Sequence, residues 1–473
     1  MRSRIARLAG GLIGLIALAG CASLAPRYER PAPAIPASWP AGDAYLRASE
    51  AALPRLGYRD IFRDPALQRI IERALANNQD LRLAVANVAS ARGLLRAQRA
   101  ELLPRIDGSA SATVGAQSRS SGGSSGSNNR STNTTYDLGV GLTAFEIDLF
   151  GRVRSLSDAA LQQYLGTEAA VRAARLTLVA EVANTYLTLA TDRSLLAIAR
   201  QTETTAARSV ELTRARLKGG VAPRTDLRQA ETILAQARSD MANLTTIVAL
   251  DRNALELLVG APVADSDLAS SIESVDGLIE ELPAGLDSGI LLRRPDVVQA
   301  EYQLRAANAR IGAARAAFFP RISLTAVAGF ASGALSSLFS GGAFAWSVQP
   351  SLLVPIFDAG ANQGNLEATR AQRDGALGQY QKTIQTAFRE VSDALARRGT
   401  IDNQYAAQVQ LEAAARDSVF LADARYREGI DDFLRSLEAQ RTLYVARRSL
   451  AATRLVRAGN LVELYRALGG DAG

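Results

Sequence analysis

The residue types that most often carry enzyme chemistry are scarce in this chain of 473 residues. It contains no histidine and a single cysteine, Cys21. Ser–His and Cys–His pairs therefore cannot form, and one cysteine cannot build a metal cluster. Glu146 and Asp148 lie two positions apart, as an acid/base pair could. Near the end of a strand, however, such carboxylates are more typical of an inward-facing polar surface. The sequence therefore predicts no catalytic residue, no metal and no cofactor.

The cysteine follows a segment with the layout of a secretory signal. Three arginines in the first seven residues precede an apolar run, Leu8–Ala19, which is too short to cross a bilayer as a helix. The run ends in Leu-Ala-Gly-Cys, the pattern of a bacterial lipobox. We expect residues 1–20 to be a lipoprotein signal peptide and Cys21 to be lipidated. Alanine rather than aspartate at position 22 favours the outer membrane. An ordinary signal peptide that contains a cysteine is the alternative.

The next segment, residues 21–60, is predicted to be an extended, lipid-anchored stretch. Its proline-rich part, residues 25–40, is typical of a tether without a core of its own. The formal net charge of the chain is +7, and three of these positive charges lie in the expected signal peptide. The remaining basic excess is too dilute to indicate a nucleic-acid partner.

The same order of parts occurs twice along the chain. Leu103-Pro104-Arg105-Ile106 recurs as Phe319-Pro320-Arg321-Ile322, a shift of 216 positions (103 to 319). The five residues that end at Gly220 recur in the five that end at Gly429, a shift of 209 positions (220 to 429). Shifts of nearly one size indicate two repeats, which we place at 61–265 and 266–473. Each repeat is expected to contain a helix, two strands, a long helix, a glycine turn and a further helix.

The strands are predicted from alternating apolar and small or polar residues. They are expected at 106–116, 136–150, 322–331 and 344–356. Strands of roughly 9–11 residues with one apolar face suit a transmembrane β-structure, whereas a soluble sandwich with one wet face is the alternative. The segment 117–135 is rich in Ser, Gly, Asn and Thr, which predicts a solvated outer loop. The matching loop at 332–342 is shorter and more apolar.

Two long stretches without proline, 154–217 and 365–427, predict long helices. At 1.5 Å per residue each would reach roughly 95 Å if continuous, far beyond the hydrocarbon thickness of about 30 Å. We therefore expect them to stand in the periplasm in coiled-coil packing. An ordinary helical bundle or a filament-like coiled coil is the alternative. Shorter helices are expected from Pro65 to Leu102 and after Pro223, Pro295 and Gly429.

Four strands cannot close a barrel, and open sheet edges cannot face lipid, because unpaired backbone groups there are strongly unfavourable. Three copies would supply twelve strands, enough for an open channel, whereas the eight strands of two copies would be filled by side chains. The predicted fold is therefore an α+β membrane protein. A long α-helical barrel and four transmembrane β-strands per chain would close a twelve-strand β-barrel in a homotrimer.

One stretch of the chain resembles a known family closely. Leu291 to Ala314, which begins Leu-Leu-Arg-Arg-Pro-Asp-Val-Val, resembles the outer-membrane efflux family of TolC-like proteins, specifically the lipoprotein branch of the NodT and OprM type. Phe145–Arg152 also fits, although the family commonly has tryptophan at the first of these positions. The resemblance covers Cys21 to about Gly469. It implies a trimer with an equatorial domain. It also implies two partners, a periplasmic adaptor and an inner-membrane transporter, usually of the resistance–nodulation–division class.

The resemblance also places a closing constriction, a periplasmic gate, just after the second glycine turn. Its apolar and acidic ring positions fall on Leu434 and Glu438. Tyr426 matches a tyrosine that holds the helices shut, and Asp226 matches an acidic partner in the first repeat. Arg435 stands where some members carry a further acid, which argues against a double acidic ring. Ordinary heptad positions are the alternative interpretation of these residues.

Gly220 and Gly429 are expected to form the helical turns, because glycine adopts turn conformations that other residues resist. These turns are expected to contact the adaptor. The predicted function is the outer-membrane exit duct of a tripartite efflux pump, passing drugs or other small toxic compounds out of the periplasm through a gated trimeric tunnel. The protein would be anchored in outer membrane lipid and extend into the periplasm. The alternatives are the duct of a type I protein-secretion system and a periplasmic coiled-coil scaffold without a pore.

Overall fold

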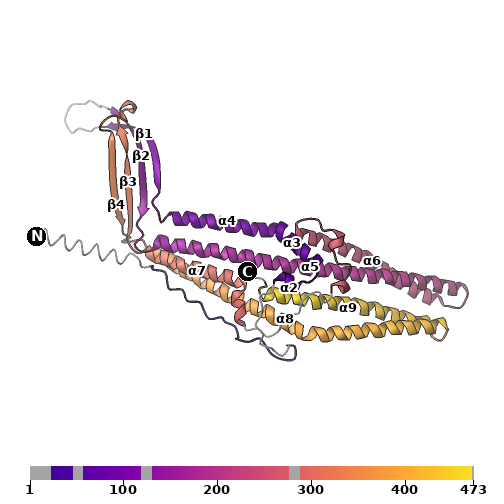
Figure 1. Ribbon diagram of the computed structural model, residues 1–473. Coiled ribbons are helices and arrows are strands. Elements are labelled where there is room, and N and C mark those ends of the chain that lie inside the picture. Colours follow the sequence, from indigo (N-terminus) through magenta and orange to yellow (C-terminus); the bar gives the residue numbers. More distant parts are fainter. Residues whose placement is uncertain (1–22, 46–56, 119–129, 276–287, 471–473) are drawn as a thin grey trace. The chain divides into compact units, whose positions relative to one another are not determined.

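The computed structural model describes residues 23–45, 57–118, 130–275 and 288–470 (Figure 1). The predicted signal peptide and Cys21 lie outside the described residues. The chain forms two compact units, and each draws on three segments of the sequence. Unit 1 comprises the described parts of Met1–Pro31, Val88–Thr167 and Ala300–Tyr380, and unit 2 those of Ala32–Asn87, Glu168–Gln299 and Gln381–Gly473.

The described elements repeat in the predicted order. The α-helices are α2 (Tyr58–Ile61), α3 (Pro65–Asn77), α4 (Gln79–Ala100), α5 (Arg152–Lys218), α6 (Arg224–Val259), α7 (Pro295–Ala316), α8 (Ala361–Arg427) and α9 (Phe433–Ala467). The strands are β1 (Ile106–Ser118), β2 (Arg130–Glu146), β3 (Arg321–Ser332) and β4 (Phe344–Leu353). Short 3-10 turns are η1 (Asp265–Asp267), η2 (Ile272–Ser274), η3 (Ser288–Arg293) and η4 (Leu335–Ser337).

The strands of unit 1 form one antiparallel sheet in the order β1-β2-β3-β4 (Figure 1). The apolar positions predicted from the sequence are cross-strand partners of one another. One such row runs Ala110, Leu138, Phe330, Phe344, and the next runs Gly108, Val140, Ala328, Trp346. Side chains of directly opposed residues share a face, so the large apolar side chains collect on one face of the sheet. This face is open in the single chain, where Trp346 is 70% exposed.

The second strand differs from its predicted range of 136–150. It begins at Arg130, and the first strand continues to Ser118, so both ends of the segment predicted as a loop, 117–135, belong to strands. The second strand ends at Glu146, because the Asp148 carboxylate accepts hydrogen bonds from the first backbone N–H groups of α5 and so ends the extended run. A register shift also occurs between Leu142 and Phe145. Ala144, with φ 50°, lies within this bulge, so Phe145 rather than Ala144 joins the apolar face. The fourth strand ends at Leu353, before the predicted end at 356.

On the opposite face of the sheet, two glycines allow β2 and β3 to approach closely. Gly139 and Gly329 are direct partners in the register. A Cβ added at Gly329 would lie 2.2 Å from the carbonyl oxygen of Leu138 and 2.5 Å from the Cα of Gly139. No side chain fits there, so this part of the small and polar face requires glycine.

The two long helices are confirmed as continuous elements. Helices α5 and α8 each contain 67 residues, close to the predicted ranges 154–217 and 365–427. The helix predicted from Pro65 to Leu102 is instead broken at Asn78. The Asn78 side chain donates to the carbonyl oxygen of Leu258 at 2.9 Å and accepts from the N–H of Leu81 at 2.9 Å, so it starts a new helix. Among the described residues, no helix combines the length and the apolar character needed to cross a membrane.

The most specific sequence motif joins three helices of unit 2. Arg294 is buried, with 5% of its surface exposed. Its guanidinium forms ion pairs with Asp296 at 2.8 Å and with Glu390 on α8 at 2.9 Å. It also donates to the carbonyl oxygen of Ala467 at the end of α9, at 2.8 Å. The Arg-Pro-Asp sequence therefore does more than start α7: it ties that start to α8 and α9.

The start of the described chain is extended but not free. Within unit 1 the Arg30 guanidinium forms an ion pair with the buried Glu301 carboxylate of α7, at 2.6 Å. The side chain of Asn308, two turns further along α7, donates to the carbonyl oxygen of Pro26 at 2.7 Å. This part of the predicted tether is therefore held against α7.

Candidate functional site

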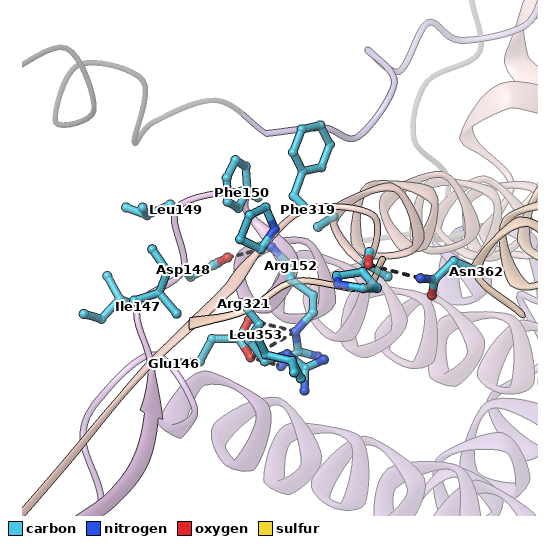
Figure 2. Close-up of a pocket in the computed structure, with 15 residues that line it drawn as sticks. Glu146, Ile147, Asp148, Leu149, Phe150, Arg152, Phe319, Arg321, Leu353 and Asn362 are labelled. Atoms are coloured by element: carbon cyan, nitrogen blue, oxygen red, sulfur yellow. Dashed lines mark hydrogen bonds and ion pairs between the residues drawn. The ribbon is translucent and has the colours of Figure 1, made fainter. Parts of the chain in front are cut away.

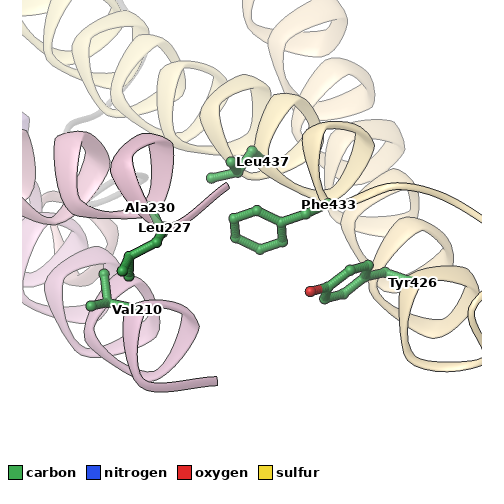
Figure 3. Close-up of a cluster of buried hydrophobic side chains, with 6 residues drawn as sticks. All are labelled: Val210, Leu227, Ala230, Tyr426, Phe433 and Leu437. Atoms are coloured by element: carbon green, nitrogen blue, oxygen red, sulfur yellow. The ribbon is translucent and has the colours of Figure 1, made fainter. Parts of the chain in front are cut away.

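The predicted gate residues lie at the ends of two helical hairpins in unit 2. The hairpin of α5 and α6 and the hairpin of α8 and α9 pack together through one buried apolar cluster (Figure 3). The first hairpin contributes Val210, Leu227 and Ala230, and the second contributes Tyr426, Phe433 and Leu437. The rings of Tyr426 and Phe433 are 5.2 Å apart. The cluster therefore joins corresponding parts of the two predicted repeats.

Tyr426 connects the hairpins through its ring. The Cζ atom of Arg216, on α5, lies 4.5 Å from the ring centre, which is a cation–π distance. Tyr426 is 7% exposed, and its hydroxyl has no hydrogen-bond partner among the described residues. Buried hydroxyl groups in proteins usually have a partner. The ring is thus the part of Tyr426 that joins the two hairpins, and the hydroxyl is enclosed between them.

Asp226 lies at the same contact between the hairpins, but its carboxylate does not hydrogen-bond to the Tyr426 hydroxyl. Burial raises the pKa of the Asp226 carboxyl, the Asp432 carboxylate adds to the rise, and the Arg216 guanidinium opposes it. The Arg216 guanidinium therefore opposes the rise in the pKa of the Asp226 carboxyl and also contacts the ring of Tyr426. The family resemblance pairs Asp226 with Tyr426, whereas the role of Arg216 was not predicted from the sequence. The available signal was its position at the start of the repeated glycine turn.

Leu434 and Glu438 lie one turn apart on α9. Their neighbours Phe433 and Leu437 point into the apolar cluster (Figure 3), so Leu434 and Glu438 project from another side of the helix. Both are exposed, Leu434 by 44%. The structure thus separates the predicted residues into two groups. Tyr426 and Asp226 lie at the contact between hairpins, and Leu434 and Glu438 form an exposed stripe beside it.

Gly220 and Gly429 occupy the predicted turns, with φ of 74° and 73°. The next residue in each turn, Val221 or Ile430, donates its N–H to the carbonyl oxygen five positions earlier, at 3.0 and 2.9 Å. This pattern is a Schellman motif, in which the left-handed position favours glycine. The apolar residue after the glycine commonly packs on its own helix in such motifs. Here Val221 is 70% and Ile430 is 62% exposed.

The second turn carries additional polar contacts. Arg425 forms an ion pair with Asp431 at 2.6 Å, which lowers the pKa of the Asp431 carboxyl. Ser436 hydrogen-bonds to Asp423, and the Gln440 side chain donates to the same carboxylate at 3.3 Å. These contacts join the end of α8 to the start of α9. The exposed side chain of Ile430 is thereby presented on a well-braced turn.

The carboxylates considered as an acid/base pair line a cavity of about 350 Å³ in unit 1 (Figure 2). Glu146 accepts from the Arg152 guanidinium at 2.7 and 2.9 Å, and Arg321 lies 3.5 Å from it. Asp148 accepts from the backbone N–H groups of Arg152 and Arg154 at 2.7 and 2.8 Å. Both carboxylates are thus half-buried groups that join β2 to α5.

Comparison with known proteins gives matches along most of the chain. A family model described as outer membrane efflux protein matches residues 70–261 and 287–470. The solvent efflux pump outer membrane protein SrpC of Pseudomonas putida is 44% identical over 464 residues, covering 97% of each chain. Outer membrane protein OprJ of Pseudomonas aeruginosa is 41% identical over 457 residues, covering 96% of this chain and 94% of its own.

A solved structure shares the fold over almost the same length. The open state of the Neisseria gonorrhoeae MtrE outer membrane channel superimposes with a TM-score of 0.84 at 35% sequence identity. The match covers 95% of this chain and 99% of that chain. The shared architecture therefore includes the sheet and the long helices.

Proposed function

Because this chain belongs to the outer membrane efflux protein family, we propose that three copies of it form the exit duct of a tripartite efflux pump. The protein is an outer-membrane channel component, and it acts by conducting solutes rather than by catalysing a reaction. Its cargo would be drugs or other small toxic compounds. The observation that supports this most directly is the sheet of unit 1, which combines an exposed apolar face with two edges that pair with no other described strand.

The edges supply the argument for a trimer. In the order β1-β2-β3-β4, the outer edges of β1 and β4 have no partner strand among the described residues. Backbone groups at a lipid-facing edge need partners, so β4 of one copy would pair with β1 of the next. Three copies would close twelve strands into a barrel wide enough for a passage. The predicted repeats, 61–265 and 266–473, would then give six similar units around the axis.

The gate would form where the hairpin ends of three copies meet. Leu434 would supply an apolar ring and Glu438 an acidic ring, since both project away from the hairpin core. The Tyr426 ring would hold the two hairpins together through its contact with Arg216, whose charge also acts on the Asp226 carboxyl. These contacts would keep the passage closed at rest.

The turns at Gly220 and Gly429 would contact the periplasmic adaptor. The exposed Val221 and Ile430 offer apolar contacts there, and the backbone around them is fixed by the Schellman bonds. The adaptor would link the duct to an inner-membrane transporter, most consistent with the resistance–nodulation–division class. Lipidation of Cys21, after removal of residues 1–20, would anchor the chain in the outer membrane.

Conductance in planar bilayers tests the channel and its gate together. The purified trimer should show small, brief openings at rest. The double variant Tyr426→Phe and Glu438→Ala should conduct more, because it changes the tyrosine that joins the hairpins and removes the acidic ring. Equal closure in the double variant would contradict the gate assignment. Absence of any conductance would favour the scaffold without a pore. A deletion strain that loses protein secretion but keeps its drug resistance would favour the secretion duct.

A further inference from the structure

The loop between β3 and β4, Ser332–Ala343, is not used by the proposed duct. It joins the strand ends that lie away from α7 and α8, because β3 follows α7 and β4 leads into α8. From Ile322 to Phe357 the sequence contains no Asp, Glu, Lys or Arg. The matching segment of the first repeat is rich in Ser, Gly and Asn and includes Arg119 and Arg130. The two loops therefore suit different surroundings.

The β3–β4 loop satisfies many of its polar groups internally. The hydroxyl groups of Ser332 and Ser337 are 2.6 Å apart, and Ser337 donates to the carbonyl oxygen of Ala334 at 3.0 Å. The Ser340 hydroxyl donates to the carbonyl oxygen of Ser337 at 2.7 Å, and the N–H of Ala343 donates to the carbonyl oxygen of Ser340 at 3.2 Å. Internal pairing of this kind is what an environment poor in water requires.

Apolar side chains of the loop extend the apolar face of the sheet. The ring of Phe339 meets Phe330 edge-on, with ring centres 5.5 Å apart, and Phe330 meets Phe344 in the same way at 5.8 Å. Phe330 and Phe344 belong to a cross-strand row of the apolar face. The loop therefore folds back over that face, where Phe339 is 71% and Leu335 is 64% exposed.

We propose that the β3–β4 loop is a lipid-contacting element, in which Phe339 and Leu335 insert among acyl chains of the outer leaflet. The inference rests on the proposed function, because it requires the apolar face to lie against the membrane. The loop has no charge, pairs the hydroxyl groups of Ser332, Ser337 and Ser340 internally, and continues the apolar surface through edge-on ring contacts. Aromatic side chains at the rim of a barrel stabilise its depth in the bilayer. The loop would thus set the depth of the outer rim.

Tryptophan fluorescence in brominated lipid tests this placement with the full-length lipidated trimer. The chain has two tryptophans, Trp39 and Trp346. One variant, Trp39→Phe, keeps only Trp346 on the apolar face. A second combines Trp39→Phe, Trp346→Phe and Phe339→Trp. A matched control replaces Phe339→Trp with Val221→Trp at the exposed hairpin turn. Each trimer is placed in phosphatidylcholine vesicles with bromines near the headgroup or near the chain end, and aqueous iodide is added separately.

The indole at position 339 should lose most of its emission to bromines near the headgroup and little to those near the chain end or to iodide. The Val221→Trp control should respond to iodide alone. Quenching of position 339 by iodide alone would overturn the inference and place the loop against water. Insensitivity to both quenchers would overturn it in favour of cover by a second copy. If the bromines did not quench the fluorescence of Trp346, the proposed membrane orientation would be wrong, and the inference would fail with it.

Discussion

Arg216 of the first repeat lies over the ring of Tyr426 of the second, with its Cζ atom 4.5 Å from the ring centre. The two residues come from the long helices α5 and α8, just before their glycine turns. The contact thus joins the repeats within one chain at the point where the passage is proposed to close. It suggests that opening requires the hairpins of a single copy to separate, in addition to any movement between copies.

Arg216→Gln should weaken closure, because it removes a cation–π contact worth roughly 0.5–2 kcal/mol. We expect more frequent channel openings in planar bilayers, with the trimer intact on a native gel. Arg214→Gln is the matched control, since Arg214 is an exposed residue on the same helix paired only loosely with Glu231 at 3.4 Å. If both variants opened the channel equally, the effect would come from lost positive charge and not from the ring contact.

Glu438→Gln should reduce the preference of the channel for cations. Three carboxylates around a narrow passage focus a negative potential, and the amide removes it with little change in shape. The reversal potential in a salt gradient should therefore move toward zero. Glu428→Gln, an exposed position at the second turn, serves as the control and should leave the reversal potential unchanged. A shift of equal size in the control would assign the selectivity to general surface charge.

Asp192 on α5 and Asp251 on α6 should make stability depend on pH. Burial, together with the neighbouring Asp251 carboxyl, raises the pKa of Asp192 from 3.8 to about 7. The folded protein therefore holds this proton at a pH where an unfolded chain releases it. The stabilising contribution is fully present below the ordinary aspartate pKa and is lost as the pH rises through about 7.

Asp192→Asn should accordingly raise the free energy of unfolding at about pH 8 by about 1 kcal/mol, allowing for solvent screening, and change it little at about pH 4. Thermal melting of the detergent-solubilised trimer at the two pH values measures the difference. Asp158→Asn, an exposed position on the same helix, should show no such difference. An equal increase in the free energy of unfolding at both pH values would show that the carboxyl pair is not the cause.

Arg294→Ala should destabilise the protein severely. It leaves the Asp296 and Glu390 carboxylates without their shared cation. Breaking a buried ion pair from one side costs about 3–5 kcal/mol, and we expect the lower end of that range because both carboxylates are partly exposed and Glu390 also lies 3.6 Å from Arg466. We expect a large fall in melting temperature and in the yield of trimer. The adjacent Arg293 is exposed, so Arg293→Ala is a close control and should behave like the unmodified protein. Similar losses in both variants would contradict the structural role of Arg294.

Much of the fold follows from local pattern in the sequence. The alternating residues around Leu138 and Trp346 predict strands with one apolar face, and the register pairs those positions with one another. The long helices follow from the absence of proline, and the turns from Gly220 and Gly429. These features depend on residues that are close in sequence, so the chain reveals them directly.

The features missed from the sequence depend on contacts between distant segments. Asn78 ends one helix because its amide reaches Leu258, which lies on α6. Arg216 acts on Tyr426 only because the two hairpins pack together. Glu146 forms an ion pair with Arg152 across a tight turn, and the alternation of apolar and polar residues did not predict that turn. In each case a polar side chain has a role that tertiary packing decides.

The outer edges of β1 and β4, which pair with no other strand in the described part of the chain, also constrain how the protein must be made. In a lone chain the apolar face of the sheet would be exposed, and the backbone groups along the outer edges of β1 and β4 would lack partner strands. Such edges favour aggregation, because strands of different molecules pair with them. We therefore expect that newly exported chains do not wait as finished monomers. Sheet formation should instead be coupled to insertion in the bilayer and to pairing with two sister chains, so that folding, insertion and assembly become a single event.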